Sequence, residues 1–454
     1  MSDYKKINLL LLVCSVISAQ SHITIYNQNK AFVQELRTLK LDKIGKNLVQ
    51  LDRIPKNADP GTILIQGEDL KVQSMKYTYN PVSETSLLNA HIGSEIELVK
   101  YGDDGDITYS TKGKLISNDS VPIFEIDGNI VVDPPYHYLF SEIPEGISEF
   151  PYLMCQLDAY TKNPESQISY LASGFGWETE YSLVLTTEST GEISGYYAIT
   201  NNSKLEYKNI DISLVSGVVE FKNKTPRGRQ FQKHRTAMAH ESFAEISPEV
   251  SESGEYAVFH ISEKLTLSPD SEIRYTFIDG IQVKVDQVYH ISHSLSRVRR
   301  NSPPQTTGVP VYTRYEFEAG AVGNFQLPAG IYNVYHQNKD KLTFIGSSRA
   351  GIAEKDTKIK LETGKAHKIL AHFTVENFKL NNESGKAVVT ALFTNLKDEN
   401  ITVEWIEQFR DGRWYIKKSD IEHETLDAFN VKFSVDIYAN STEEVTFTAI
   451  MDKD

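Results

Sequence analysis

Two pairs of histidines have a spacing that invites a test for metal binding. His290 and His293 lie three residues apart in YHISHS, and His367 and His372 lie five apart in HKILAH. Imidazole nitrogens are common zinc ligands. However, residues an odd number apart on a β-strand point to opposite faces, so neither pair would converge on one ion. We therefore predict no metal site and no metal cofactor at these histidines.

Carboxylates offer two further sets of candidates. Glycoside hydrolysis with retention needs two carboxyl groups about 5 Å apart, one of them desolvated. Glu178 and Glu180 would share the polar face of a strand at about 6 to 7 Å, and we interpret them, like Glu404 and Glu407, as part of solvated strand faces.

The acidic run GDDGD at residues 102–106 could offer Asp103, Asp104 and Asp106 to calcium. It lacks the later bidentate Glu that an EF-hand loop requires. Because it lies between two strand-like runs, we interpret it as a hairpin turn.

Nucleophile chemistry has little support in the sequence. Cys155 lies in the apolar stretch YLMCQL, where no neighbouring His or helix terminus would lower its pKa, so we expect a buried, inert thiol. No nucleophile elbow, P-loop, dinucleotide fingerprint or zincin motif is present. Catalytic residues on a β scaffold can come from distant positions, so a dispersed active site remains an alternative. We predict no catalytic, cofactor-binding or metal-binding residue.

Aromatic residues are the remaining binding candidates. An exposed tyrosine can hold a sugar ring or a protein partner at low entropic cost, although most tyrosines on strands belong to the core or to cross-strand pairs. The candidates are Tyr136, Tyr138, Tyr152, Tyr332 and Tyr335.

Alternation of apolar and polar residues indicates the elements that must carry these side chains. Period-two runs occur in NIDISLVSGV, NITVEWI and VKFSVDI, and turn sequences such as Asp127-Gly128 separate the strand-like runs. No helical stripe exceeds about two turns. The pattern predicts an all-β protein with two or three antiparallel β-sandwich (Ig-like) domains in series.

Residues 1–21 have the layout of a secretory signal peptide. Lys5 and Lys6 precede the apolar run INLLLLVCSVISA, and small residues follow it. Spanning a bilayer takes about 20 apolar residues, so we predict cleavage and export to a periplasmic, outer-envelope or secreted location, with no membrane span in the mature chain. An uncleaved N-terminal anchor is the alternative. The net charge of −14 argues against nucleic acid as a partner.

Breaks in the alternation predict the domain boundaries. We expect an N-terminal β domain at residues 22–155, a β-sandwich at 165–296 with a mobile insertion at 223–254, a proline-rich linker at 297–310 and a C-terminal β-sandwich at 311–454. The basic clusters at 227–235 and 297–300 are interpreted as solvated loop charge, and RVRR at 297–300 is also a possible site of proteolytic processing.

Two segments echo each other. In GYYAITNNSKLEYKNIDISLV (195–215) and TALFTNLKDENITVEWI (390–406), a strand ends in Thr-Asn, a polar turn follows and an alternating strand returns. An Asn can bond its own backbone at such a corner. The echo predicts two similar hairpins in two sandwich domains, with chance similarity as the alternative.

At these segments the chain resembles a bacterial family of exported proteins with a domain of unknown function, which includes the mucoidy-inhibitor-like proteins. The matching stretches are HITIYNQNKAFVQELRTLKL, YLASGFGWETEYSLVL, GYYAITNNSKLEYKNIDISLVSG, LPAGIYNVYHQNKDKLTFIG and FTNLKDENITVEWIEQFRDGRWYI. The resemblance implies a β-rich envelope protein whose conserved domain spans residues 165–454, and it brings no catalytic residues. The chain differs from the family pattern after Gly364 and lacks the coiled coil of the mucoidy-inhibitor-like members.

Taken together, these observations favour a non-enzymatic envelope protein that binds an envelope protein or a surface polysaccharide, or serves as a scaffold. The alternative is a carbohydrate-active or proteolysis-related enzyme with a dispersed active site.

Overall fold

The protein is all-β, as the alternation predicts. The computed structural model describes residues 12–13, 17–217, 219–221, 256–296, 298–410 and 413–452, with side chains from Ser21 onward. Within this part the helical elements are α1 (Glu84–Ala90) and the short 3-10 turns η1 (Pro60–Thr62) and η2 (Ala319–Ala321). None of the described helices has the length and apolar character needed to cross a membrane. The predicted mobile insertion and most of the predicted signal peptide lie outside the described residues.

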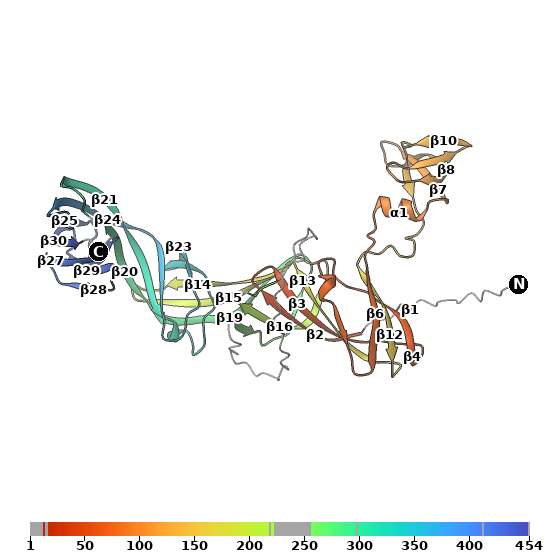
Figure 1. Cartoon of the computed structure of the whole chain (residues 1–454), viewed down its shortest axis with the longest axis horizontal. Coiled ribbons are helices and arrows are strands. Elements are labelled where there is room, and N and C mark those ends of the chain that lie inside the picture. The colour runs from red at the N-terminus through yellow and green to blue at the C-terminus, as the bar shows by residue number, and fades with distance from the viewer. Residues whose placement is uncertain are drawn as a thin grey trace. The chain divides into compact units, whose positions relative to one another are not determined.

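The chain divides into two compact units, and it passes between them three times. Unit 1 contains residues 1–177 and 199–273, and unit 2 contains residues 178–198 and 274–454. The three crossings fall inside the strands β14 (Phe175–Leu185), β15 (Thr190–Asn201) and β19 (Ser271–Lys284), which Figure 1 labels. The division differs from the three consecutive segments expected from the sequence, because long strands continue through the points where a linker would have to lie.

Unit 1 contains a seven-stranded sheet and two smaller sheets. The seven-stranded sheet consists of β17 (Ala257–His260), β16 (Tyr207–Ser216), β2 (Ile17–Tyr26), β3 (Lys30–Thr38), β13 (Glu165–Ser173) and β5 (Leu64–Gln66), with β18 (Leu265–Leu267) also paired to β16. A four-stranded sheet consists of β1 (Leu12–Val13), β4 (Gly45–Leu51), β12 (Tyr152–Ala159) and β6 (Leu70–Thr78).

The third sheet of unit 1, which we call the small sheet, has its own core. In order across the sheet its strands are β10 (Asn129–Val132), β9 (Ile123–Ile126), β8 (Ile107–Ser117), β7 (Glu95–Tyr101) and β11 (His137–Leu139). The buried side chains that pack together in this core are Leu88 of α1 and Ile96, Leu98, Leu115 and Phe124 of the strands. Ser83 caps α1 in a capping box with Ser86, which satisfies free N–H groups at the start of this short helix.

Unit 2 is built on a nine-stranded sheet that folds into a sandwich. In order its strands are β27 (Arg413–Ser419), β30 (Ser441–Asp452), β25 (Ser384–Asn395), β24 (Lys358–Lys379), β21 (Ser302–Glu318), β20 (Asp286–Leu295), β26 (Ile401–Phe409), β29 (Asn430–Ile437) and β28 (His423–Thr425). A further five-stranded sheet runs β19-β15-β14 and continues into β22 (Gly330–Asn338) and β23 (Lys341–Ala350).

The proline-rich stretch predicted as a linker is largely strand. Residues 302–310 form the first half of β21 and pair with β24, whereas β20 pairs only with the second half, from Tyr312 onward. Two of the three shifts in register between β21 and β24, at Ser302/Gln305 and Pro310/Tyr312, occur where the prolines lie, and the third is at Thr313/Arg314. Because proline cannot donate to a ladder, it is tolerated at bulges and at edges, and this half of β21 offers both.

The same strand arrangement occurs twice in the chain. In unit 1 the order is β18-β16-β2-β3-β13, and in unit 2 it is β29-β26-β20-β21-β24. In each copy one pairing is parallel, β16 with β2 and β26 with β20, and the other pairings in these two series are antiparallel. The neighbours β14-β15-β19 likewise correspond to β24-β25-β30. The predicted echo is therefore part of a repeated sandwich, and the small sheet lies in the segment inserted between β3 and β13.

Buried asparagines mark the repeat. Asn201, at the end of β15, directs its Nδ2 to the carbonyl oxygens of Leu205, Leu267 and Ser268 at 3.0, 3.2 and 3.0 Å. Its Oδ1 accepts the N–H of Ser203 at 3.0 Å.

Asn395, at the end of β25, makes the same set of bonds. Its Nδ2 is directed to the carbonyl oxygens of Glu399, Ile437 and Tyr438 at 2.8, 3.4 and 3.0 Å, and its Oδ1 accepts the N–H of Lys397 at 3.0 Å. The strands on either side are not hairpin partners: β25 pairs with β24 and β30, whereas β26 pairs with β20 and β29. Each asparagine thus holds a corner between strands that pair elsewhere, rather than the predicted hairpin.

The next turn repeats as well. Asp270 and Asn440 precede β19 and β30 with left-handed φ angles of 47° and 53°. The N–H of Asp270 donates to the carbonyl of Ser203 at 3.4 Å, and that of Asn440 donates to the carbonyl of Lys397 at 3.0 Å. Asp and Asn are the residues that adopt this conformation at least cost apart from glycine, so the turn chemistry agrees with the geometry in both copies.

Candidate functional site

The histidines and glutamates singled out in the sequence meet in unit 2, in pairs that were not expected. The parallel pairing of β20 with β26 places His290 opposite Glu404 and His293 opposite Glu407. The odd spacing sends the two pairs to opposite faces, as predicted for the histidines alone. The residue opposite each histidine in this register is more than 100 residues away in the chain, but only His293 contacts the glutamate opposite it.

His293 and Glu407 lie inside the sandwich. Glu407 is fully buried, so its interpretation as part of a solvated strand face is wrong. Its two carboxylate oxygens are 3.0 and 2.8 Å from Nδ1 of His293. The indole N–H of Trp405 donates to the same carboxylate at 3.1 Å, and the imidazole stacks on Phe373 with centroids 4.4 Å apart. Burial raises the pKa of Glu407, and His293 opposes that rise. Because packed side chains surround this pair, we interpret the histidine as the polar partner that stabilises the buried Glu407 carboxylate within the core.

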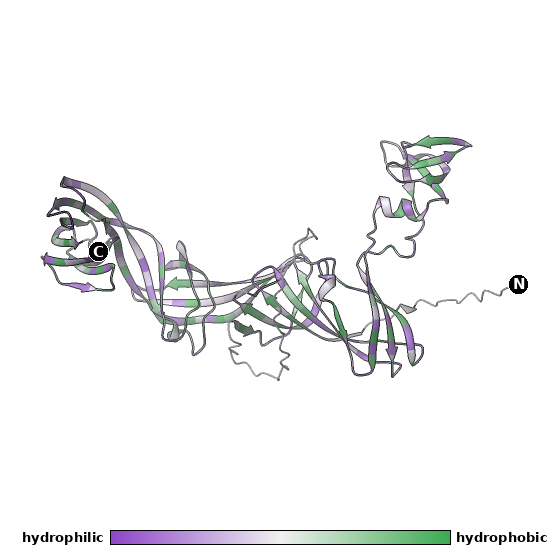
Figure 2. Cartoon of the chain, viewed as in Figure 1, coloured by the Kyte–Doolittle hydropathy of each residue, from purple (hydrophilic) through white to green (hydrophobic). Residues whose placement is uncertain are grey.

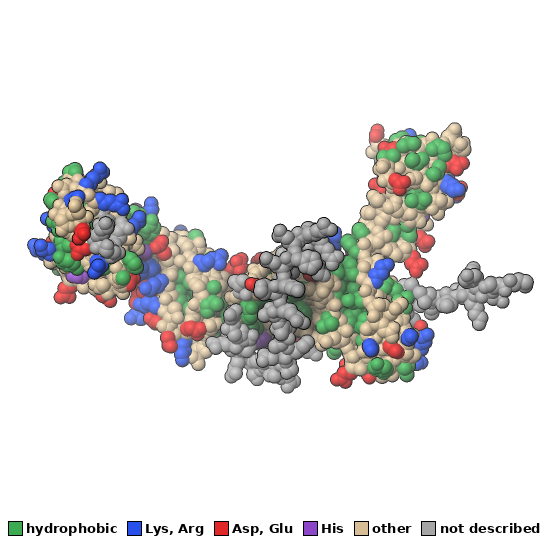
Figure 3. All heavy atoms as spheres, viewed as in Figure 1, with side chains coloured by type: hydrophobic (Ala, Val, Ile, Leu, Met, Phe, Trp, Pro, Cys, Tyr) green, Lys and Arg blue, Asp and Glu red, His purple; other side chains and the backbone are tan. Residues whose placement is uncertain are grey.

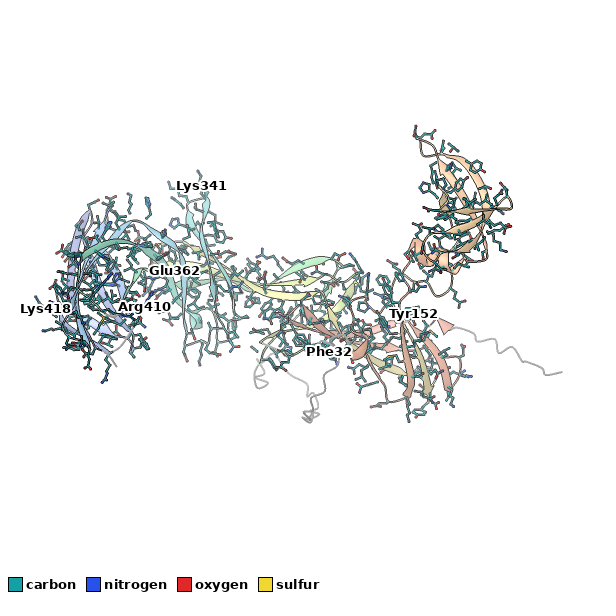
Figure 4. The ribbon with its side chains drawn as sticks, turned by 45° about the horizontal axis from the view of Figure 1, so that its top comes forward. Phe32, Tyr152, Lys341, Glu362, Arg410 and Lys418 are labelled. Carbon is teal, nitrogen blue, oxygen red and sulfur yellow. The ribbon has the colours of Figure 1, made fainter. Side chains whose placement is uncertain are left out.

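On the other face, His290 belongs to a network of compensated charges. Arg314 donates to Glu316 at 2.5 Å and to Glu404 at 2.8 Å, and Nε2 of His290 lies 3.0 Å from the Glu362 carboxylate. Burial lowers the pKa of His290, and Arg314 lowers it further. Figure 4 labels Glu362 on β24. Each cation here already has a carboxylate partner, so the network is not prepared to receive a charged ligand.

A serine–histidine cluster in unit 1 escaped the sequence analysis. Oγ of Ser213, on β16, lies 3.2 Å from Nε2 of His22 on β2 and 3.0 Å from Nδ1 of His260 on β17. Asp211 favours the protonated form of His22, but burial is the larger influence and lowers the pKa of that histidine. Ser213 is only 3% exposed. A nucleophilic serine needs an approachable hydroxyl and donors for an oxyanion, and this hydroxyl is enclosed by its histidine partners.

The other predicted site residues are separate from one another. Glu178 is exposed, and Glu180 forms an ion pair with Arg274. Cys155 is buried on β12, and burial raises the pKa of its thiol to about 11, which agrees with an inert cysteine. His367 and His372 are exposed on β24. Among the described residues, no three His, Cys, Asp or Glu side chains gather in a way that could hold a metal ion.

The acidic turn and the tyrosines are explained by the fold. Residues 102–106 join β7 to β8, which pair as an antiparallel hairpin, so that prediction is confirmed. Tyr332 is fully buried and stacks on Tyr181 at 4.1 Å. The remaining four candidate tyrosines are half-buried, and three of them lie in ring pairs: Tyr136 with Tyr109, Tyr138 with Phe124, and Tyr335 with Phe344. None of the five is a fully exposed platform for a sugar.

A polar hollow of about 610 Å³ lies beside β5 and β13 in unit 1. Its lining side chains are carboxylates, amides and one leucine: Leu36, Gln66, Glu68, Asp69, Asn163, Glu165 and Gln167, with Gly67. No aromatic, basic or nucleophilic side chain lines it. This lining therefore lacks a nucleophile, and it gives no indication of a catalytic site.

The small sheet is where the surface departs from that of an ordinary soluble domain. Nine large apolar side chains are exposed between residues 92 and 139: Ile92, Tyr101, Ile107, Tyr109, Ile116, Val121, Ile130, Val132 and Leu139. We call these residues the small-sheet surface. Figures 2 and 3 show hydrophobic residues on this part of the molecule, with acidic side chains among them. The pairings place Ile130 on the face of the sheet opposite to the core residue Phe124, whereas Tyr109 lies on the core side, so the nine side chains occupy both faces. Exposed apolar side chains in such number are typical of interaction sites, so the small-sheet surface is the candidate functional site.

Comparisons with known proteins do not identify a function for this site. No protein-family model matches the chain, and no curated protein matches it. The family resemblance described above therefore stays a prediction.

Proposed function

We propose that the protein is an exported, non-enzymatic envelope protein whose small sheet binds another protein. The observation that carries the proposal is the small-sheet surface, with nine exposed apolar side chains around a core cluster of five buried residues. Aliphatic side chains dominate this surface, and they suit a protein partner better than a polysaccharide, which favours planar aromatic rings.

Two further features support this proposal. The repeated sandwich retains its structural asparagine corners in both copies, which suits a scaffold that presents an inserted binding element. Export rests on the signal-like sequence of residues 1–21. The parallel pairing of β2 with β16 begins at His22, so removal of those residues would leave this ladder whole. It would also remove β1 and the first pairs of β2 with β3, from Ile17 to Ser21.

The test is crosslinking in the native host, followed by recovery of the full-length protein and identification of what is attached. We expect one reproducible envelope protein, and we expect Ile130→Ser to reduce its recovery several-fold. Leu342→Ser, which removes an equally exposed aliphatic side chain (57% against 62%) in unit 2, serves as the matched control and should change nothing. Recovery of the protein alone despite efficient crosslinking would contradict the proposal.

The serine–histidine cluster favours one alternative, an enzyme with a dispersed active site. Because the Ser213 hydroxyl is enclosed, we expect a fluorophosphonate probe to leave the folded protein unlabelled. The measurement is intact mass after incubation with the probe, in parallel with Ser213→Ala. Labelling of the parent that Ser213→Ala abolishes would establish a nucleophilic serine and overturn the non-enzymatic assignment.

A further inference from the structure

The strand β10 is a free sheet edge whose backbone groups point away from the sheet. It pairs with β9 on one side, and no other described strand pairs with it. Asp127 and Gly128 form the two-residue turn between the strands, both with positive φ (49° and 77°), as a type I′ hairpin requires. A ladder bond from Asp133 N–H to the Pro122 carbonyl at 2.9 Å continues the register.

This register decides which residues face outward. In an antiparallel ladder, alternate residues exchange both hydrogen bonds with the partner, and the residues between them direct N–H and C=O to the other side. Asn129, Val131 and Asp133 are the residues bonded to β9, because the tight turn and the Asp133 bond fix the phase. Ile130 and Val132 therefore offer their backbone groups at the free edge.

The same two residues expose their side chains. Ile130 is 62% and Val132 58% exposed, and residues two apart lie on one face of a strand. Natural proteins protect a free edge with charged side chains, proline or a bulge within the strand. The sequence of β10, Asn-Ile-Val-Val, contains none of these, so the edge is suited to accepting another strand.

The charge of the region selects the partner. Between Glu84 and Glu142 the chain has eleven Asp and Glu residues and three Lys residues. Asp127 and Asp133 flank β10, and Glu125 lies opposite Ile130. A second copy of this chain would bring a second set of these carboxylates to the edge, which opposes pairing between copies, whereas Lys or Arg at the ends of an added strand would be attracted.

We propose that β10 binds an extended segment of another protein by strand addition, and that this segment has branched aliphatic residues at alternate positions with Lys or Arg at both ends. Main-chain hydrogen bonds from Ile130 and Val132 supply the pairing, their side chains contact the aliphatic residues, and Asp127 and Asp133 contact the basic ends. The inference rests on the proposed function, because it specifies the partner of the same surface.

The test measures binding of a labelled, end-capped peptide, Lys-Val-Thr-Val-Lys, to the full chain by fluorescence anisotropy. Val132→Pro removes one outward N–H and leaves the ladder with β9 intact, as an edge strand tolerates. We expect it to weaken binding about fivefold, which is the factor that one net hydrogen bond contributes to affinity. Leu342→Ser removes an exposed aliphatic side chain (57%) from the strand β23 in unit 2, outside the small-sheet surface, and this control should bind like the parent.

Charge is tested separately. Asp127→Asn with Asp133→Asn keeps residues that accept positive φ, and it should weaken binding several-fold and remove most of its salt dependence. The peptide Glu-Val-Thr-Val-Glu should bind much more weakly to the parent. An unchanged circular dichroism spectrum and unfolding midpoint confirm that each variant is folded.

Several results would overturn the inference. Equal binding by Val132→Pro, equal binding of the acidic peptide, or a dimer in sedimentation that Val132→Pro dissociates would each do so. The proposed function fails separately: crosslinking in the host would then recover no partner, although the peptide binds the purified protein. Conversely, a partner recovered equally with Val132→Pro would leave the proposed function standing and remove β10 from it.

Discussion

Replacement of His293 by alanine is expected to lower the free energy of unfolding of the unit 2 sandwich by about 3 to 5 kcal/mol. The substitution removes the imidazole that lies 2.8 Å from the fully buried Glu407 carboxylate. A buried charge without a partner is far more costly than a buried pair. Urea denaturation followed by tryptophan fluorescence measures the change, because the Trp405 indole is bonded to the same carboxylate.

A double variant separates the lost pair from lost packing. His293→Leu together with Glu407→Leu removes both polar groups and keeps apolar volume, so it should recover most of the stability. A loss below about 1 kcal/mol for His293→Ala would show that the pair is not buried in solution as it is in the structure.

The pH dependence of the His293→Ala variant follows from the raised pKa of Glu407. Burial is the main cause of that rise. A carboxyl whose pKa is raised by folding favours the folded state most when it is protonated, so its contribution is complete below the ordinary value of about 4.3 and is lost as the pH rises through the folded value. Without His293 the folded pKa rises further, so the penalty should be larger at neutral pH than at mildly acidic pH.

Substitution of the corner asparagines should have comparably large effects. Asn395→Asp and Asn201→Asp remove the amide donors and place a carboxylate against three carbonyl oxygens. Leaving a buried polar group unsatisfied costs about 1 to 3 kcal/mol, and more for a charged one, so we expect each change to cost about 3 kcal/mol or more. Chemical denaturation measures both.

The neighbouring Asn202 provides the control, because its side chain is exposed. Asn202→Ala should change stability by no more than about 0.5 kcal/mol. If Asn201→Asp and Asn395→Asp differed widely, with one of them near zero, the two corners would not be equivalent and the repeat would be limited to strand order.

Much of the strand content could be predicted because it depends on local pattern. The alternation around Val403 and Trp405 identified β26, and the Thr-Asn echo identified both corners. Asp127-Gly128 marked a tight turn, since positive φ at both positions restricts the residues that fit. The corners were mistaken for hairpins because the sequence shows that the chain turns but not which strand it then joins.

Features that depend on long-range pairing could not be predicted. Glu407 continues the inward-facing series of Val403 and Trp405, a signal that was available, but its partner His293 is set by the parallel register of β20 with β26. Similarly, Ser213 meets His22 only because β16 lies beside β2. The proline-rich start of β21 resembled a linker because composition alone does not show where a strand has bulges that accommodate proline.

The three crossings between the units set the order in which each unit can be completed during synthesis. The strand β2 lies between β3, its neighbour in the chain, and β16, which is about 190 residues further on. Unit 1 therefore cannot close until residue 273 is available, and by then the chain has already delivered residues 178–198 of unit 2. A chain that emerges from its N-terminus must keep the open edge of β2 unpaired throughout this interval. While the residues between β3 and β16 are being synthesised, the unpaired edge of β2 is therefore the part of the chain that a chaperone would most need to cover.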